Sequence, residues 1–343
     1  MESMGRAKEQ PILSPDDIEN LTYPNLNLND HIVDEKLPVV APCSANTPAS
    51  TLPTANLGAL DALPLELLQE ILCQLDLRTL TDFRYVNRRA TELVDYLPQH
   101  RAITTHARNT LRAILGIGTG RWITCKSLCQ KLHTPRCERC GDFGSYLYLL
   151  TCKRVCFLCM SQDQLFLPLS PNRARRKFGL EYGDLKTLPR MRAIRGIYSP
   201  NSKRVATRCI LVDHESALRA GVARHGSLTA MNEYVAGKEA QKLHAYNATV
   251  VAAQQSGSCK RRRRPAVLDP FDGHSGNPFR FVAISRVPSV SRASGKVEWG
   301  FYCVGCRKSK CRPQHWRRKF TAVSFHEHLK QCGNIRRGQH HLD

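Results

Sequence analysis

The chain has 343 residues, with 51 Lys and Arg against 29 Asp and Glu and a formal net charge of +22. This length allows two or three compact modules, because single domains usually run roughly 100–200 residues. No apolar run approaches the ~18 residues of a membrane span, so we expect no such span. The first residues lack a basic segment followed by an apolar one, so we expect a protein that is not secreted.

The charge is unevenly distributed along the chain. Residues 1–56 hold eight acidic side chains against three basic ones, whereas residues 104–343 hold 43 basic against 14 acidic. A field of this sign attracts nucleic acid, an anionic membrane surface or an acidic protein without choosing among them. The charge therefore limits the class of partner and says little about the fold.

The modules expected from the sequence differ in composition. The first segment is rich in Pro, Asn and Asp and has too little apolar area to offset chain entropy. Apolar residues then recur at helical spacing, with later stretches that alternate with period two around Ser294 and Gly295. We expect an α+β, multi-module fold. Its modules are a disordered acidic arm (1–56), three short helices (58–104), a basic Cys-rich module (105–198), a helical segment (199–255) with Ser227 as an N-cap, a basic linker (256–277) and a β-hairpin followed by a helix (278–343).

The leucines of residues 65–75 cover a wide arc of the predicted helix. On a helical wheel they spread over roughly 160°, whereas a surface helix needs only about 100° to face its own core. Three short helices bury proportionally little surface among themselves. The surplus indicates a surface that contacts another protein; the alternative is that it packs against later segments of this chain.

The same residues resemble a known motif. The run Leu-Pro-Leu-Glu-Leu-Leu-Gln-Glu-Ile-Leu at 63–72, with Leu-Asp-Leu-Arg-Thr-Leu at 75–80 and Val-Asn-Arg-Arg-Ala at 86–90, resembles the F-box. The resemblance implies docking on a Skp-type helical adaptor, which links the chain to a cullin scaffold in a ubiquitin ligase. The residues that it assigns to this interface are Leu63, Pro64, Leu67, Leu68, Ile71, Leu72, Leu75, Leu80 and Val86.

A looser resemblance covers most of residues 58–335. F-box proteins of filamentous fungi follow the motif with cysteine pairs and a Trp-Gly-Phe/Tyr-x-Cys-x-x-Cys segment. Here the corresponding residues are Trp299, Gly300, Phe301 and the pair Cys303 and Cys306. The chain is therefore similar to a fungal F-box protein with a Cys-rich C-terminal region.

Fifteen cysteines are many for a protein expected in a reducing compartment. Cys137 and Cys140 form one C-x2-C pair, and Cys156 and Cys159 form a second, with fifteen residues between the pairs. Each two-residue spacer lets one tight turn aim two thiolates at one ion, and two turns complete a tetrahedron. We expect a structural Zn²⁺ here, with Cys152 as a spare thiol.

A second set of potential ligands lies near the C-terminus. Cys303 and Cys306 follow the predicted hairpin, and His328 and Cys332 are spaced i, i+4 on one face of a helix predicted over 323–332. These four residues predict a second structural Zn²⁺, with His326 and Cys311 as alternatives for the fourth ligand. Four protein ligands leave no open position, so both sites are expected to be structural rather than catalytic.

The C-terminal part of the chain also contains two clusters of basic residues. Lys260, Arg261, Arg262, Arg263 and Arg264 resemble a nuclear-import signal, although a solvated linker has the same composition. Arg312, Arg317, Arg318 and Lys319 surround Trp316, and such a cluster binds either single-stranded nucleic acid or a protein. We expect a location in the nucleus, the cytoplasm or both.

These observations predict a protein that is not an enzyme, because no paired acids, Gly-rich phosphate loop or activated nucleophile is evident. The expected function is that of a substrate receptor in a Skp–cullin–F-box ligase, which recruits an unknown protein substrate through its basic C-terminal region. The alternative is a zinc-containing nucleic-acid-binding or transcriptional regulatory protein, with steeply salt-dependent binding.

Overall fold

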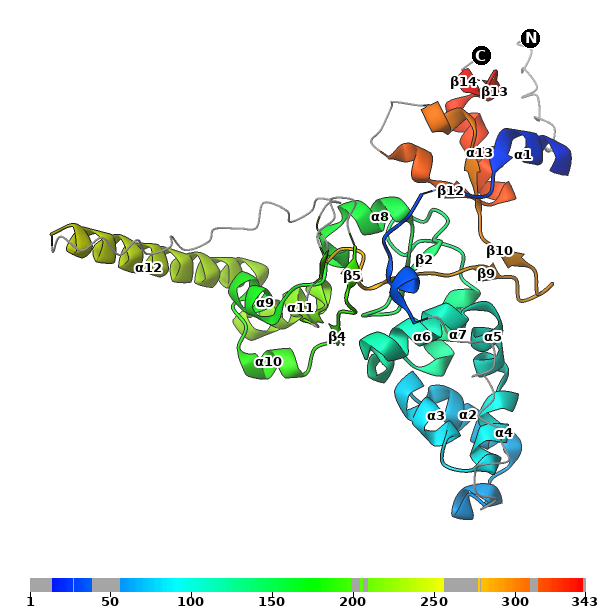
Figure 1. The fold of residues 1–343 in the computed structure, drawn as a ribbon, viewed down its shortest axis with the longest axis horizontal. Coiled ribbons are helices and arrows are strands. Elements are labelled where there is room, and N and C mark those ends of the chain that lie inside the picture. The colour runs from blue at the N-terminus through cyan, green and yellow to red at the C-terminus, as the bar shows by residue number, and fades with distance from the viewer. Residues whose placement is uncertain are drawn as a thin grey trace, which may run out of the picture.

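The computed structural model describes residues 14–26, 28–38, 56–198, 204–205, 209–255, 277, 279–308 and 314–341. Helices predominate and the sheets are small (Figure 1). Within these residues no helix combines the length and the hydropathy that crossing a bilayer would need.

The leucine-rich region forms four short helices rather than three. They are α2 (Leu65–Gln74), α3 (Leu77–Arg84), α4 (Arg88–Tyr96) and α5 (Pro98–His106). The Asp76 side chain caps α3 by accepting hydrogen bonds from two backbone N–H groups, and Asn87 caps α4 by accepting one. Pro98 occupies the first turn of α5, where its missing N–H costs nothing. These local signals set the helix boundaries.

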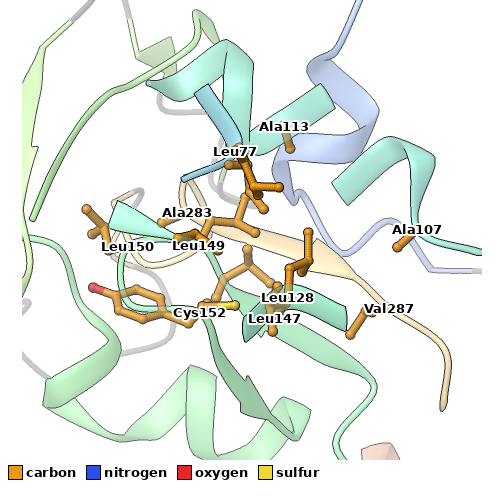
Figure 2. Packing of buried hydrophobic residues seen from close by; sticks show 14 of the residues in the cluster. Leu77, Ala107, Ala113, Leu128, Leu147, Leu149, Leu150, Cys152, Ala283 and Val287 are labelled. Atoms are coloured by element: carbon orange, nitrogen blue, oxygen red, sulfur yellow. The ribbon is translucent and has the colours of Figure 1, made fainter. Parts of the chain in front are cut away.

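Two further helices pack on this group and join it to a three-stranded sheet. They are α6 (Arg108–Ile117) and α7 (Cys125–Leu132). The sheet has the order β3-β2-β8, all antiparallel, with β2 (Tyr146–Tyr148), β3 (Lys153–Val155) and β8 (Ile284–Arg286). One hydrophobic core runs from the α2–α7 helices into this sheet. Figure 2 shows Leu77, Leu128, Leu147, Ala283 and Val287 within it.

The predicted hairpin forms only in part. Strands β9 (Ser289–Val290) and β10 (Val297–Glu298) pair antiparallel across the expected turn. The preceding residues leave the hairpin, because β8 pairs with β2 at Tyr146↔Arg286. The alternation correctly predicts strands, but the pairing partner lies about 140 residues away, which a local pattern cannot reveal.

A second helical unit follows the sheet. It contains α9 (Pro171–Phe178), α10 (Tyr182–Lys186), α11 (His214–His225) and α12 (Leu228–Gln255), whereas α8 (Phe157–Gln162) packs into the core shared with the sheet. It also contains the two-stranded pairs β4 (Arg190–Arg192) with β7 (Ile210–Val212), and β5 (Gly196–Ile197) with β6 (Arg204–Val205). The predicted cap is present, since Ala230 N donates to Ser227 Oγ at 3.0 Å. Helix α12 extends away from the rest of the chain (Figure 1).

The C-terminal unit is small and contains short elements. They are β11 (Phe301–Cys303), β12 (Lys319–Phe320), α13 (Ala322–Cys332), β13 (Asn334–Arg336) and β14 (Gln339–His341). Helix α13 matches the helix predicted over 323–332. Among the described residues, the buried core of this unit consists of Cys303, Cys306, Phe320, Phe325 and Leu329, and partly buried Ile18, Leu21, Phe301 and Ile335 pack against it.

The prediction of a disordered arm over 1–56 is wrong for residues 14–26 and 28–38. They form α1 (Pro15–Leu21), β1 (Thr22–Tyr23) and the 3-10 turn η1 (Val33–Lys36), and Ile32 and Val33 are fully buried. Strand β1 pairs with β11 at Thr22↔Cys303. The partners of this segment are α6, β8 and β11, all distant from it in the sequence, so its composition alone suggested disorder.

Candidate binding surface and metal centres

Helix α2 presents one of its two apolar faces to solvent. Leu67 is 55% exposed and Ile71 is 46% exposed, whereas Leu68 and Leu72 on the adjacent face are 3% and 2% exposed. The buried face packs into the core shared with α7. The exposed face is therefore surplus to the fold of this chain, as the width of the apolar arc predicted.

The predicted interface residues divide into two groups. The exposed group is Leu63, Pro64, Leu67, Ile71 and Val86. The second group supports the helices from inside: Leu68, Leu72 and Leu80 are buried, and Leu75 is partly buried. Three further apolar side chains of this segment are exposed although they were not assigned to the interface: Leu60, Leu65 and Tyr85 are 39%, 49% and 53% exposed. The wide helical wheel was the signal that could have identified Leu65.

The first cysteine set comes together as its spacing predicted. The thiols of Cys137, Cys140, Cys156 and Cys159 lie within 4.8 Å of one another. Gly141 has φ +81° and allows the turn after the first pair. Cys156 is the N-cap of α8, where its Sγ accepts a hydrogen bond from Cys159 N at 3.4 Å.

The spacing of these thiols suits a tetrahedral ion. Cys140 Sγ and Cys156 Sγ are 3.6 Å apart, close to the ~3.8 Å edge of a tetrahedron with Zn–S bonds of ~2.3 Å. Hydrogen bonds among these thiols lower the pKa of Cys137 and Cys140 and raise the pKa of Cys156 and Cys159. A bound cation would favour the thiolate form of all four. This group could hold a metal ion.

A buried arginine supports this first cluster. The guanidinium of Arg154 is fully buried and donates to the carbonyls of Gly144 at 2.6 Å and Lys131 at 2.6 Å. It also donates to the carbonyl of Pro288 at 3.0 Å. Arg154 therefore ties the cysteine turn to α7 and to the strand segment near 288. Burial lowers its pKa to about 10, so the guanidinium stays charged at neutral pH.

The second cluster contains three of the four predicted residues. Cys303, Cys306 and His328 lie together with His340, and the ligand atoms of all four are within 4.8 Å of one another. Cys306 Sγ is 3.3 Å from His328 Nε2 and 3.4 Å from His340 Nε2. The two Nε2 atoms are 3.2 Å apart, which fits the edge of ~3.3 Å expected from Zn–N bonds of ~2.0 Å. This group could also hold a metal ion.

The structure places His340, and not Cys332, in the fourth position. Cys332 Sγ lies 3.5 Å from Nδ1 of His328, on the side of the ring away from the cluster. His340 reaches the cluster from β14, and its Nδ1 contacts the Gly333 carbonyl at 2.9 Å, a contact of the kind that orients metal-bound imidazoles. The i, i+4 spacing put Cys332 near His328, but the β13–β14 hairpin brings His340 closer. Only the doubled His at 340–341 hinted at this in the sequence.

The other potential ligands have different surroundings. Cys152 is buried in the hydrophobic core, where burial raises its pKa to about 12, so it serves as an apolar side chain. Cys311 lies outside the described residues, as do Lys260, Arg261, Arg262, Arg263 and Arg264 of the predicted import signal.

One carboxylate connects the N-terminal segment to both metal-binding units. Asp30 Oδ2 accepts from Tyr146 Oη at 2.7 Å and from Arg286 Nη2 at 2.7 Å, and Asp30 also pairs with Arg317. Burial alone would raise the pKa of Asp30, but Arg317, Arg286 and Tyr146 together hold it below its usual value. The ionised Asp30 thus joins strands β2 and β8 to the C-terminal unit.

This network uses part of the basic cluster that surrounds Trp316. Arg317 is 8% exposed and pairs with Asp30, and Arg318 donates to Asp142 Oδ1 at 2.5 Å. Burial is the main reason why the pKa of Lys319 falls to about 8. Arg317 and Arg318 are thus paired with carboxylates of this chain, Lys319 donates to the Trp299 carbonyl at 2.8 Å, and Arg312 lies outside the described residues.

The comparisons with known proteins concern the segment that carries the exposed apolar face of α2. The family model described as the F-box domain matches residues 60–101. Neither the curated proteins nor the solved structures that were compared gave a match. The match covers α2, α3 and α4 and the first residues of α5, and it includes the exposed leucine face. Residues 60–101 of this chain are therefore an F-box domain.

Proposed function

We propose that this chain is the substrate receptor of a Skp–cullin–F-box ubiquitin ligase. The observation that carries the proposal is the exposed apolar face of α2, within a segment that matches the F-box domain. Fully burying one Leu side chain contributes about 1.5–3 kcal/mol. A cluster of such side chains therefore supplies a strong driving force for docking on a Skp-type adaptor, which links the chain to a cullin.

In this proposal the chain is not an enzyme and its contribution is positional. It holds a target protein near the ubiquitin-conjugating enzyme carried by the cullin, which raises the effective concentration of the target lysine at the thioester. The part of the chain that follows the F-box, residues 104–343, supplies the surface for the target. Its charge of +29 over residues 104–343 favours an acidic partner.

We assign Zn²⁺ to both Cys/His clusters in the proposed protein. Four sulfur ligands, or two sulfur and two nitrogen ligands, are the sets typical of structural zinc. The core around Cys303 and Cys306 contains few side chains, and a small unit of this kind gains on the order of 10 kcal/mol from metal binding. Zinc would therefore stabilise the fold of the C-terminal unit.

Co-precipitation with a purified Skp-type adaptor tests the function. The unmodified chain should bind, and the double variant Leu63→Asp with Leu67→Asp should not. Binding that persists in the double variant would show that this face is not the interface. The proposed location in the nucleus or cytoplasm is tested separately, by imaging a tagged chain in which Lys260, Arg261, Arg262, Arg263 and Arg264 are replaced by glutamine.

A further inference from the structure

An arginine-lined groove lies beside the F-box, outside the surface and the metal centres described above. It has a volume of about 520 Å³ and lies between the first turn of α3, the loop that follows α6 and the β4–β7 pair. Arg78, Arg121, Arg190 and Arg192 contribute to its walls, and no lining residue is acidic. Trp122, 41% exposed, provides an aromatic surface among these cations.

Most of this positive charge is not neutralised by the chain. Arg78 pairs with Asp82 at 2.9 Å. Arg121, Arg190 and Arg192 are exposed, and within the part of the chain that the structure describes they form no ion pair. Three like charges around one groove repel one another, and an anionic ligand would relieve that repulsion.

Strand β4 also has one unused edge. Ala193 N donates to Cys209 O at 2.9 Å, so this residue, and with it Met191, turns its backbone groups toward β7. Backbone groups of consecutive residues point to opposite edges of a strand, so those of Arg190 and Arg192 point away from β7. Among the described residues β4 has β7 as its sole strand partner, and neither Arg190 N nor Arg192 N donates to the backbone of another segment.

We propose that this groove binds an extended acidic peptide of a partner protein, which adds a strand to the free edge of β4 and places its carboxylates against the arginines. The unused N–H and C=O groups match a peptide backbone. Arg190 and Arg192 are two residues apart on one strand, roughly 6.8 Å. Acidic residues at alternate positions of the added strand have the same spacing. The free strand edge favours a peptide over a nucleic acid, which has no such backbone to pair.

The acidic peptide is a substrate class for the receptor function proposed above. Binding of the peptide does not depend on that function; only its description as a substrate rests on it. Peptide binding and adaptor binding are separate measurements on the same full-length chain. Loss of adaptor binding by all forms, with peptide binding intact, would remove the ligase role and leave the groove standing. The reverse result would remove the groove alone.

The test is fluorescence anisotropy with a labelled short peptide that has glutamate at alternate positions. Arg190→Gln with Arg192→Gln should weaken binding by about tenfold or more, since two charge-assisted hydrogen bonds are lost. The matched control Arg176→Gln with Arg219→Gln removes the same charge from exposed positions outside the groove and should change affinity by less than about twofold. Adaptor binding and circular dichroism should be unchanged in both variants.

Three competitor ligands separate the alternatives. The glutamine version of the peptide should fail to compete. A version methylated on alternate backbone nitrogens keeps its charge but cannot pair as a strand, and should bind about tenfold more weakly. Equal binding of the methylated peptide, equal loss in the control variant, or tighter binding of a single-stranded oligonucleotide would each overturn the proposal.

Discussion

Leu67 and Leu68 are consecutive residues of α2, yet Leu67 is 55% exposed while Leu68 is 3% exposed. The helix rotates by about 100° between them, so one side chain supports the fold and the other faces solvent. This division separates stability from binding in the F-box domain. The two functions can therefore be tested by substitutions at adjacent positions.

Leu63→Asp combined with Leu67→Asp should abolish adaptor binding without unfolding the chain. Both side chains are exposed, so a charge there does not enter the core, but it would be desolvated in an interface. The measurement is a pull-down with purified adaptor. The matched control is Val251→Asp with Val323→Asp, two exposed apolar residues on α12 and α13, which should bind normally. Equal loss in both double variants would contradict the assignment.

Leu68→Ala should lower the free energy of unfolding by about 2–5 kcal/mol, because it leaves a cavity in the core. Leu67→Ala should change it by less than about 0.5 kcal/mol, as is usual for surface positions. Urea unfolding monitored by circular dichroism measures both. Similar losses for the two variants would show that Leu67 is covered in the folded chain.

His340→Ala should reduce the zinc content from two ions per chain to one, whereas Cys332→Ala should retain two. The reason is that His340 lies within the second cluster and Cys332 contacts the far side of the His328 ring. Elemental analysis of the purified variants provides the measurement. Loss of zinc from the Cys332 variant, with zinc retained in the His340 variant, would reverse the ligand assignment.

Removal of metal should release the N-terminal segment from the C-terminal unit. Strand β1 pairs directly with the strand that carries Cys303, and Val304 N donates to Leu21 O at 3.1 Å. Hydrogen exchange of residues 18–26 should therefore become faster after chelation, by tenfold or more as roughly 1.4 kcal/mol of protection is lost. Cys137→Ser, which affects the first cluster, serves as a control and should leave this segment protected. Unchanged hydrogen exchange in the metal-free protein would show that metal at the second cluster does not hold residues 18–26 in place.

Asp34→Asn should stabilise the protein at neutral pH. Burial raises the pKa of Asp34 from 3.8 to about 6, so the folded state disfavours the carboxylate. Because the folded state binds the proton more tightly than the unfolded one, this residue lowers stability as pH rises from about 4 to about 6, and the cost persists above. The variant should gain about 1–3 kcal/mol at pH 7 and nothing below pH 4. Its amide oxygen can still accept from Arg286 N, which is 2.7 Å from Asp34 Oδ2.

Thermal unfolding of the Asp34→Asn variant and the unmodified chain across this pH range measures the difference. Asp82→Asn, on an exposed residue of α3 that pairs with Arg78, is a suitable comparison. A variant that is less stable than the unmodified chain at pH 7 would show that the ionised carboxylate contributes favourably.

The elements that the sequence predicted correctly depend on interactions between residues that are close together in the chain. The F-box helices, the Ser227 cap and the first cluster of four cysteines all depend on residues close together in the chain. Helical periodicity, N-cap side chains and C-x2-C turns act over two to about twenty residues. Such signals can be read without knowledge of the fold.

The tertiary structure decided what depended on distant partners. Residues 14–26 and 28–38 are held against the rest of the chain because Asp30 pairs with Arg286 and Arg317 and β1 pairs with β11. His340 completes the second cluster because a hairpin returns it to His328. The groove at Arg190 and Arg192 likewise forms where three separate elements converge. The sequence alone determined local helices and ligand turns, whereas long-range pairing energies, which no local pattern encodes, selected the partners.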